Sequence, residues 1–220
     1  MHALKLFLVS AVLTASTAAN ALTLVQTSDP GFYNDNIGTV LNGTNGGESG
    51  PFPVGDDSNL AFPTAPDLSA AGSILGDWLT DPLHLNGNWT HRDSIPNSWA
   101  VGTEVAVMYE FDTLGATNVS ASFGVDNGIF VWLDGAYLFG HRAAGTHVLG
   151  EYVVPVGDLG AGTHFLQLLL EDHGATNGYD VQITADSFTP GPPPVPEPRA
   201  AGLLGALLLA LGMRTRERLG

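Results

Sequence analysis

Apolar and polar residues alternate along the second half of the chain. In the segment TEVAVMYEF, one face holds Val105, Val107, Tyr109 and Phe111, and the other holds Ala106, Met108 and Glu110. In the segment TNVSASFG, Val119, Ala121 and Phe123 alternate with Asn118, Ser120 and Ser122. A period of two residues is typical of half-buried antiparallel strands. The pattern therefore predicts two such strands between residues 103 and 124.

The next segment, GIFVWLDGAYLFG, predicts a β-hairpin, because Asp134-Gly135 suits a tight two-residue turn. Its first strand is apolar on both faces, with Phe130 and Trp132 on one of them. We expect a central strand that is covered on both sides. Either the loop-rich segment before residue 100 packs over Phe130 and Trp132, or the two rings line a ligand groove. Covering is favoured, since large apolar patches are seldom left open.

Three further β segments follow, separated by glycine-rich turns: HVLGEYVVPV, THFLQLLLED and GYDVQITADSF. Short strands at regular spacing, without alternating helices, indicate an all-β fold. We predict an antiparallel β-sandwich, jelly-roll-like, over residues 22–189. Residues 22–102 of this domain are loop-rich, with a short helix around Leu68 to Leu79, and residues 103–189 hold the regular strands.

The N-terminus has the pattern of a secretory signal peptide. Lys5 gives a basic start, Leu6 to Leu13 is mostly apolar, and Ala19-Asn20-Ala21 fits a small-x-small cleavage site. We expect residues 1–21 to be removed after Ala21. The expected partners of this segment are the secretion translocase and signal peptidase.

The C-terminus predicts a second sorting segment. Residues 190–198 form a proline-rich linker that ends in Pro196, Glu197 and Pro198, and residues 199–220 form a transmembrane helix with a basic tail of Arg214, Arg216 and Arg218. The uncharged run from Ala200 to Met213 reaches ~21 Å as a helix, against a hydrocarbon core of ~30 Å. So short a span favours a signal that is held only until it is read.

This order of motifs closely resembles the PEP-CTERM sorting signal, over the 26 residues from Val195 to Gly220. Arg199 and Glu217 are small departures from the pattern. The resemblance implies that an exosortase, a membrane-embedded peptidase, recognises and processes the tail. It also implies export across the inner membrane, transient membrane anchoring, and a final place in the cell envelope, at the surface or in an exopolysaccharide-rich biofilm matrix.

Charge and composition exclude several function classes. Between residues 22 and 195 only Arg92 and Arg142 are basic, against 20 Asp and Glu. Because this surface repels phosphates, nucleic-acid binding is not expected, and the membrane is contacted only through the tail. The absence of cysteine excludes thiol catalysis and thiolate zinc sites. Nucleophile elbows, phosphate loops and HExxH motifs are missing, so no catalytic residue is predicted.

Two sets of residues are candidates for ligand binding. Acidic and amide side chains at turns could supply calcium with oxygen ligands, or simply stabilise the turns: Asp126, Asn127, Glu171, Asp172 and Asp180. Among the tryptophans, Trp89 and Trp132 could offer a flat platform to a sugar ring, or could be core.

The stretch FGVDNGIFVWLDGAYLFG resembles PA14-type and related carbohydrate-binding-like β-sandwiches, over fewer than 20 residues. Our first hypothesis is a non-enzymatic envelope or matrix protein that binds exopolysaccharide. The alternatives are a secreted polysaccharide-active enzyme, a purely structural matrix protein without a ligand, and a tail-anchored membrane protein that is not processed.

Mass spectrometry of the surface-exposed protein tests the sorting prediction. We expect a mature N-terminus at Leu22 and a C-terminus that lacks the basic tail, because the exosortase acts near Pro196-Glu197-Pro198. Recovery of an intact peptide covering residues 214–220 from the surface form would contradict it and would favour the tail-anchored alternative.

Overall fold

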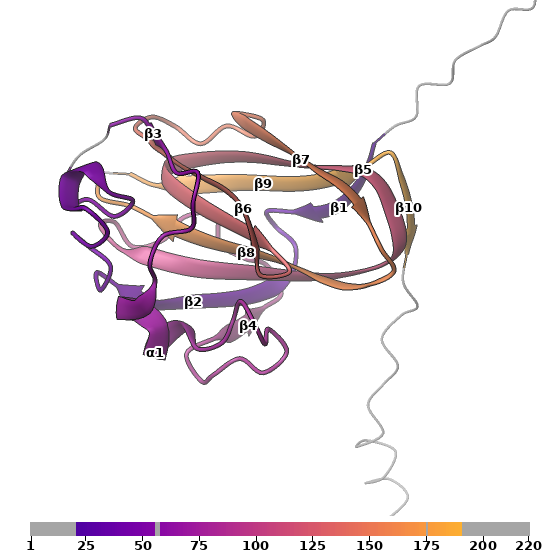
Figure 1. Cartoon of the computed structure of the whole chain (residues 1–220), viewed down its shortest axis with the longest axis horizontal. Coiled ribbons are helices and arrows are strands. Elements are labelled where there is room, and N and C mark those ends of the chain that lie inside the picture. The colour runs from indigo at the N-terminus through magenta and orange to yellow at the C-terminus, as the bar shows by residue number, and fades with distance from the viewer. Residues whose placement is uncertain (1–20, 56–57, 175, 191–220) are drawn as a thin grey trace, which may run out of the picture. The chain divides into compact units, whose positions relative to one another are not determined.

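The structure is a computed structural model, and it describes residues 21–55, 58–174 and 176–190 (Figure 1). The chain divides into two units, Met1–Pro190 and Gly191–Gly220, and the described residues all belong to the first. The expected signal peptide and sorting tail lie outside the described residues, apart from Ala21 and Pro190, so they stay predictions. Within the described ranges, no helix is long and apolar enough to cross a bilayer.

The described residues form one ten-stranded sheet. Its strands are β1 (Leu22–Gln26), β2 (Gly31–Gly38), β3 (Leu60–Ala61), β4 (Thr90–Arg92), β5 (Glu104–Leu133), β6 (Ala136–Ala143), β7 (Tyr152–Leu159), β8 (Gly162–Glu171), β9 (Gly178–Ala185) and β10 (Ser187–Pro190). Each strand pairing is antiparallel. The prediction of a mostly antiparallel β fold is therefore confirmed.

Strand β5 determines the shape of the sheet, because it pairs in three successive stretches. Its first stretch, residues 105–113, lies along one edge of β8, and its last, residues 128–133, lies along the other edge. Between them, residues 116–126 pair with β7 and β9. The sheet consequently curls back on itself (Figure 1). Three of the strands predicted separately are thus parts of one continuous strand, and the jelly-roll-like sandwich stays a prediction.

The main hydrophobic core lies inside this curl. The inward positions predicted from alternation are buried, among them Val107 on the first stretch of β5 and Phe123 on the second. Leu168 of β8 and Val181 of β9 pack in the same cluster. Period-two alternation therefore identified the inner face correctly at residues 119–123. The first stretch of β5 is not half-buried as predicted, because Ala106 and Met108 on its other face are also 0% exposed.

The hairpin between β5 and β6 also follows its sequence signal. Asp134 and Gly135 both have positive φ, at 51° and 76°, as the tight two-residue turn requires. Asp134 Oδ1 accepts a hydrogen bond of 2.8 Å from the backbone N–H of Phe165, which ties the turn to β8.

The helix expected around Leu68 to Leu79 is much shorter in the structure. It consists of a 3-10 turn at Ser69–Ala71 followed by α1 at Gly72–Leu75. Gly76, with a φ of 63°, leaves the helical conformation directly after α1. A second 3-10 turn lies at Gly47–Ser49.

The loop-rich segment covers the outer face of β8 and of the two stretches of β5 beside it, and it forms a second core there. Phe130 and Trp132 are 0% and 2% exposed. Their rings contact Phe52 and Trp78 at centroid distances of 5.3 and 5.6 Å. Covering by the segment before residue 100 is thus confirmed. The interpretation of Trp132 as a ligand platform is wrong, because this packing excludes its ring from solvent.

Replacing Trp132 with alanine tests the second core. We expect Trp132→Ala to lower the free energy of unfolding by about 3–5 kcal/mol, because it leaves a large cavity against Trp78. The exposed Val153, at 61% exposure, provides a control. Val153→Ala should change the same quantity by less than about 0.5 kcal/mol. Denaturant titration measures both, and equal effects would show that the loop-rich segment does not cover the sheet in solution.

Candidate functional site

Acidic side chains gather at one end of the curled sheet, where three stretches of chain meet. Strand β5 begins there at Glu104 and turns back there at Asp126, and β8 ends there at Glu171, followed by Asp172. These four residues, the acidic cluster, are between 1% and 5% exposed. So many buried carboxyl groups need partners, since burying an ionised carboxylate alone is very costly.

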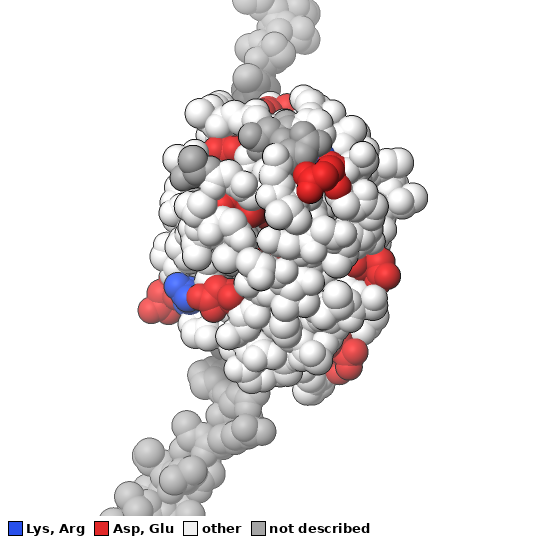
Figure 2. Space-filling model, turned by 90° about the vertical axis from the view of Figure 1, so that its left-hand side faces the viewer, with Lys and Arg blue, Asp and Glu red and all other residues white. Residues whose placement is uncertain are grey.

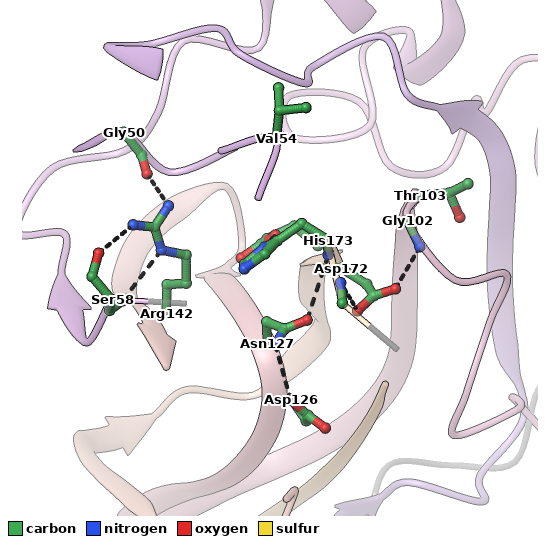
Figure 3. Close-up of polar contacts among 12 residues, drawn as sticks. Gly50, Val54, Ser58, Gly102, Thr103, Asp126, Asn127, Arg142, Asp172 and His173 are labelled. Carbon is green, nitrogen blue, oxygen red and sulfur yellow. Dashed lines mark hydrogen bonds and ion pairs between the residues drawn. The ribbon is translucent and has the colours of Figure 1, made fainter. Parts of the chain in front are cut away.

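Hydrogen bonds fix part of the cluster (Figure 3). Asp172 accepts one from the backbone N–H of Gly102, at 2.5 Å, and one from that of Gly174, at 3.1 Å. Asn127 donates from Nδ2 to Asp126 Oδ1 at 3.1 Å, and its Oδ1 accepts from the backbone N–H of His173 at 3.4 Å. The two aspartates are therefore anchored by backbone and amide groups.

The glutamates are less well satisfied. Glu171 Oε2 lies 2.9 Å from His173 Nδ1, and both side chains are buried. Its other oxygen, Oε1, has no hydrogen-bond partner among the described residues, and neither does Glu104 Oε2. A buried oxygen without a donor is unfavourable unless the carboxyl group is protonated or a cation lies nearby.

The raised pKa values of the carboxyl groups are consistent with this shortage of hydrogen-bond partners. Burial, together with the charges of Glu171 and Asp172, raises the pKa of Glu104 to about 8. Burial also raises the pKa of Glu171, opposed by its hydrogen bond to His173. Burial likewise raises the pKa of Asp126, opposed by the Thr176 hydroxyl. Glu104 therefore retains its proton at neutral pH unless a cation replaces it.

Gly128 leaves the space that the Glu171 carboxyl group occupies. The two residues are opposite each other in the pairing of β5 with β8. A β carbon at residue 128 would overlap the Glu171 carboxylate. Any larger residue here would force Glu171 to move, so the glycine of the Asp126-Asn127-Gly128 turn is required by the cluster.

Arg142 of β6 ties the covering loops to the sheet beside the cluster. Its guanidinium donates hydrogen bonds to the Gly50 carbonyl, at 2.7 Å, and to the Ser58 hydroxyl, at 2.8 Å (Figure 3). Arg142 is fully buried, and its charge is one of the smaller influences that lower the pKa of Glu171. These hydrogen bonds hold the covering loops against β6.

Four of the five predicted calcium ligands are brought together, since Asp126, Asn127, Glu171 and Asp172 all belong to this site. Asp180 lies elsewhere, on β9, where its Oδ1 accepts a long hydrogen bond of 3.4 Å from the Thr27 hydroxyl. Within the described ranges, no three His, Asp or Glu side chains are arranged to hold a metal ion. Calcium binding at this cluster therefore stays a prediction.

The predicted platform Trp89 is 9% exposed, and its indole N–H donates to the Leu75 carbonyl at 3.0 Å. Part of the ring lines a shallow pocket of 240 Å³ with Phe32, Leu83 and Glu110. Because Trp89 also packs on Trp78, it is mainly a core residue of the second cluster.

Sequence reasoning missed Glu104 and His173. Glu104 shares its face of β5 with Ala106 and Met108, both fully buried, so an acid on an apolar face was the available signal. His173 follows Glu171 by two residues, but nothing in the sequence indicated that both would be buried. Their significance comes from long-range pairing, which the local pattern does not record.

No known protein family matches the chain, and no curated protein does. Among solved structures, a β-glucuronidase from Ruminococcus gnavus in complex with D-glucuronic acid is similar at a TM-score of 0.44 and 9% identity, over 79% of this chain and 31% of that chain. A PA14 sugar-binding domain from an RTX adhesin is similar at a TM-score of 0.31 and 13% identity, over 62% and 73%. An exo-beta-1,3-galactanase from Phanerochaete chrysosporium is similar at a TM-score of 0.27 and 13% identity, over 44% of this chain and 23% of that chain.

The chain spans about a third of the length of the glucuronidase and less than half of the first structure found, an anti-sigma factor domain-containing protein. The likenesses are to β folds that include sugar-binding and glycosidase proteins, at low identity and low TM-scores. The function of this chain is therefore argued from its own residues.

The raised pKa of Glu104 predicts a stability that falls with increasing pH. Between its ordinary value of 4.5 and about 8, folded Glu104 holds a proton that the unfolded chain releases. Stability from this group is therefore fully present below pH 4.5 and is lost as the pH rises toward 8, by on the order of a few kcal/mol.

Thermal unfolding in a chelator from pH 5 to pH 8 measures this slope. Glu104→Gln should flatten the slope, because glutamine keeps the shape without titrating. The exposed Asp77 serves as the control, and Asp77→Asn should leave the slope unchanged. A slope that is equally steep in Glu104→Gln would show that other groups cause it.

Proposed function

We propose that this protein is an exported cell-envelope or extracellular-matrix protein that binds exopolysaccharide without cleaving it, and that calcium stabilises its β domain at the acidic cluster. The observation that carries the proposal is the pair of buried, unpartnered glutamate oxygens, Glu104 Oε2 and Glu171 Oε1. A divalent cation would satisfy both and would replace the protons that burial otherwise retains.

Calcium fits this set of donors better than other metals. It takes six to eight oxygen ligands in flexible geometry, including amide and backbone oxygens. The Asn127 amide and the carbonyl groups of the nearby turns could therefore complete a ligand set that the carboxylates alone do not provide. The lack of cysteine leaves no thiolate ligand of the kind that structural zinc sites use.

Burial also favours binding over catalysis. A glycosidase needs two carboxyl groups that contact the glycosidic bond. Glu104 and Glu171 are each 1% exposed, so a sugar chain cannot reach them in this conformation. One observation supports the enzyme alternative: with a pKa of about 8, Glu104 would keep its proton at neutral pH, as a general acid does.

The surface charge supports an extracellular, non-nucleic-acid role. Acidic side chains are spread over the face seen in Figure 2, and basic ones are rare there. Such a surface keeps an exported protein soluble and discourages contact with anionic polymers. Sorting by an exosortase rests on Pro196-Glu197-Pro198 and the basic tail, and it is proposed from the sequence alone.

Glycan binding and reducing-sugar release, each measured on the full-length chain with millimolar calcium and with a chelator, test the proposal. We expect glycan binding without sugar release. Calcium should raise the free energy of unfolding by about 2–3 kcal/mol at a concentration 100 times its dissociation constant. Glu171→Gln should abolish the calcium effect, while Asp77→Asn should keep it.

Three outcomes would overturn parts of the proposal. Release of reducing sugar that is lost in Glu104→Gln would establish the enzyme alternative. Neither binding nor release would leave a purely structural matrix role. Stabilisation by calcium that persists in Glu171→Gln would place the ion outside the acidic cluster.

A further inference from the structure

A second polar site lies on the outer face of the sheet, away from the acidic cluster. It is a groove of about 580 Å³ between β1, β9, the loop at residues 94–97 and the loop before β7. We call it the β9 groove. Its main lining side chains are Gln26, Ile95, Asn97, Leu149, Asp180 and Gln182.

Three amide side chains of the β9 groove are not used by the fold, whereas Asp180 accepts the hydrogen bond from Thr27. Gln26 and Gln182 are opposite each other in the pairing of β1 with β9. Within the described part of the chain, neither glutamine side chain makes a hydrogen bond, and nor does the Asn97 side chain. Three amides from three elements thus present free donors and acceptors to the same groove.

Two glycines leave room for the loop before β7, which forms the far wall of the groove. A β carbon at Gly124 would overlap the backbone of Val148, and one at Gly178 would overlap the His147 ring. The loop that holds His147 and Val148 therefore lies directly on the sheet. Its next residue, Leu149, is 42% exposed at the edge of the groove. The groove consequently has an apolar edge at Leu149, with the 3% exposed core residue Ile95 also in its lining, and a polar side at the amides.

The near wall of the groove is fixed before any ligand binds. The backbone N–H of Tyr179 donates to the Asn97 carbonyl at 3.0 Å. The Asn177 side chain accepts a hydrogen bond from the backbone N–H of Trp99 at 3.0 Å and donates one to the Trp99 backbone carbonyl at 3.1 Å. Gly102, at the end of the same loop, donates to Asp172 of the acidic cluster. A wall held in this way loses little entropy when a ligand binds.

We infer that the β9 groove binds a neutral oligosaccharide. An amide pairs a donor with an acceptor, as adjacent sugar hydroxyls do, and the apolar edge suits the C–H face of a sugar ring. Among the described residues, no Lys, Arg or His lines the groove, and the carboxylate of Asp180 repels anions. Uronic-acid polymers and phosphates are therefore poor ligands for it. The inference rests on the proposed function, since it locates the exopolysaccharide site and limits it to uncharged sugars.

The link through Gly102 and Asp172 predicts that the two sites are coupled. Calcium at the acidic cluster would hold Asp172, and through Gly102 the loop that forms the near wall. Removing calcium should therefore weaken binding in the groove without abolishing the groove itself. The Gly102–Asp172 hydrogen bond would couple the sites through a direct contact. Measuring glycan binding of the variants with and without a chelator tests this coupling.

Equilibrium binding of the full-length chain to cello-, manno- and galacto-oligosaccharides, with oligogalacturonate and an unstructured peptide as comparison ligands, tests the inference. We expect binding to at least one neutral series, little affected by salt. The double variant Gln26→Ala/Gln182→Ala should weaken it by about tenfold or more, because several neutral hydrogen bonds are lost. Thr184→Ala, at the next outward position on β9, is the matched control and should bind as the parent does.

A competing location provides the sharpest contrast. The pocket beside Trp89 is lined mainly by apolar side chains, among them Leu83, which is 68% exposed. It also contains the carboxyl group of Glu110. If Leu83→Ala or Glu110→Gln weakens sugar binding and the double glutamine variant does not, the β9 groove is the wrong site. Preference for oligogalacturonate, strengthened by Asp180→Asn, would overturn the neutral class. Preference for the peptide would overturn the saccharide class.

The outcomes also separate this inference from the proposed function. Calcium-dependent glycan binding that is unchanged in the double glutamine variant would refute the groove and keep the proposed function. Glycan binding that depends on the two glutamines and is unchanged in a chelator would keep the groove and refute the calcium part. Absence of binding to every glycan, neutral or charged, would refute both, whereas binding of oligogalacturonate alone would refute the inference and keep the proposed function.

Discussion

The pairing of both ends of β5 with the two edges of β8 is the constraint on which the rest of the structure depends. Because Leu168 faces Val107 on one side and Val131 on the other, the chain between those residues must leave this part of the sheet and return. Residues 116–126 make that excursion, and they pair with β7 and β9 as they do so. The inner core, the outer cover and the acidic cluster all follow from this closure.

The closure places charge where water is excluded. Because the chain turns back at Asp126, the start of β5, this turn and the end of β8 lie at one place. They contribute Glu104, Asp126 and Glu171, respectively. Hydrogen bonds from Gly102, Gly174 and Asn127 satisfy the aspartates, but Glu104 is left with a raised pKa. A native fold rarely retains such groups unless a ligand or a proton compensates them.

Loops join the acidic cluster to the sheet's outer face. The segment from Asn97 to Gly102 is bonded to β9 at one end and to Asp172 at the other. It is the physical connection between the buried cation site that we propose and the surface groove that we infer. If both proposals hold, this short loop would let a cation bound at the cluster alter the exposed groove.

The sequence by itself determined β structure after residue 103, the inner face at residues 119–123 and the Asp134-Gly135 hairpin, because period-two alternation and turn chemistry are local. It also indicated that turn acids such as Asp126 and Glu171 were candidates for one site. It did not identify β1 to β4, which lie in the segment predicted as loop-rich. Only the tertiary structure decided that Glu104 joins them, that Asp180 does not, and that Trp132 is core. Those outcomes depend on β5 reaching both edges of β8, a pairing between residues far apart along the chain. Such pairings are set by how the curled sheet closes and packs, which no local pattern of apolar and polar residues specifies.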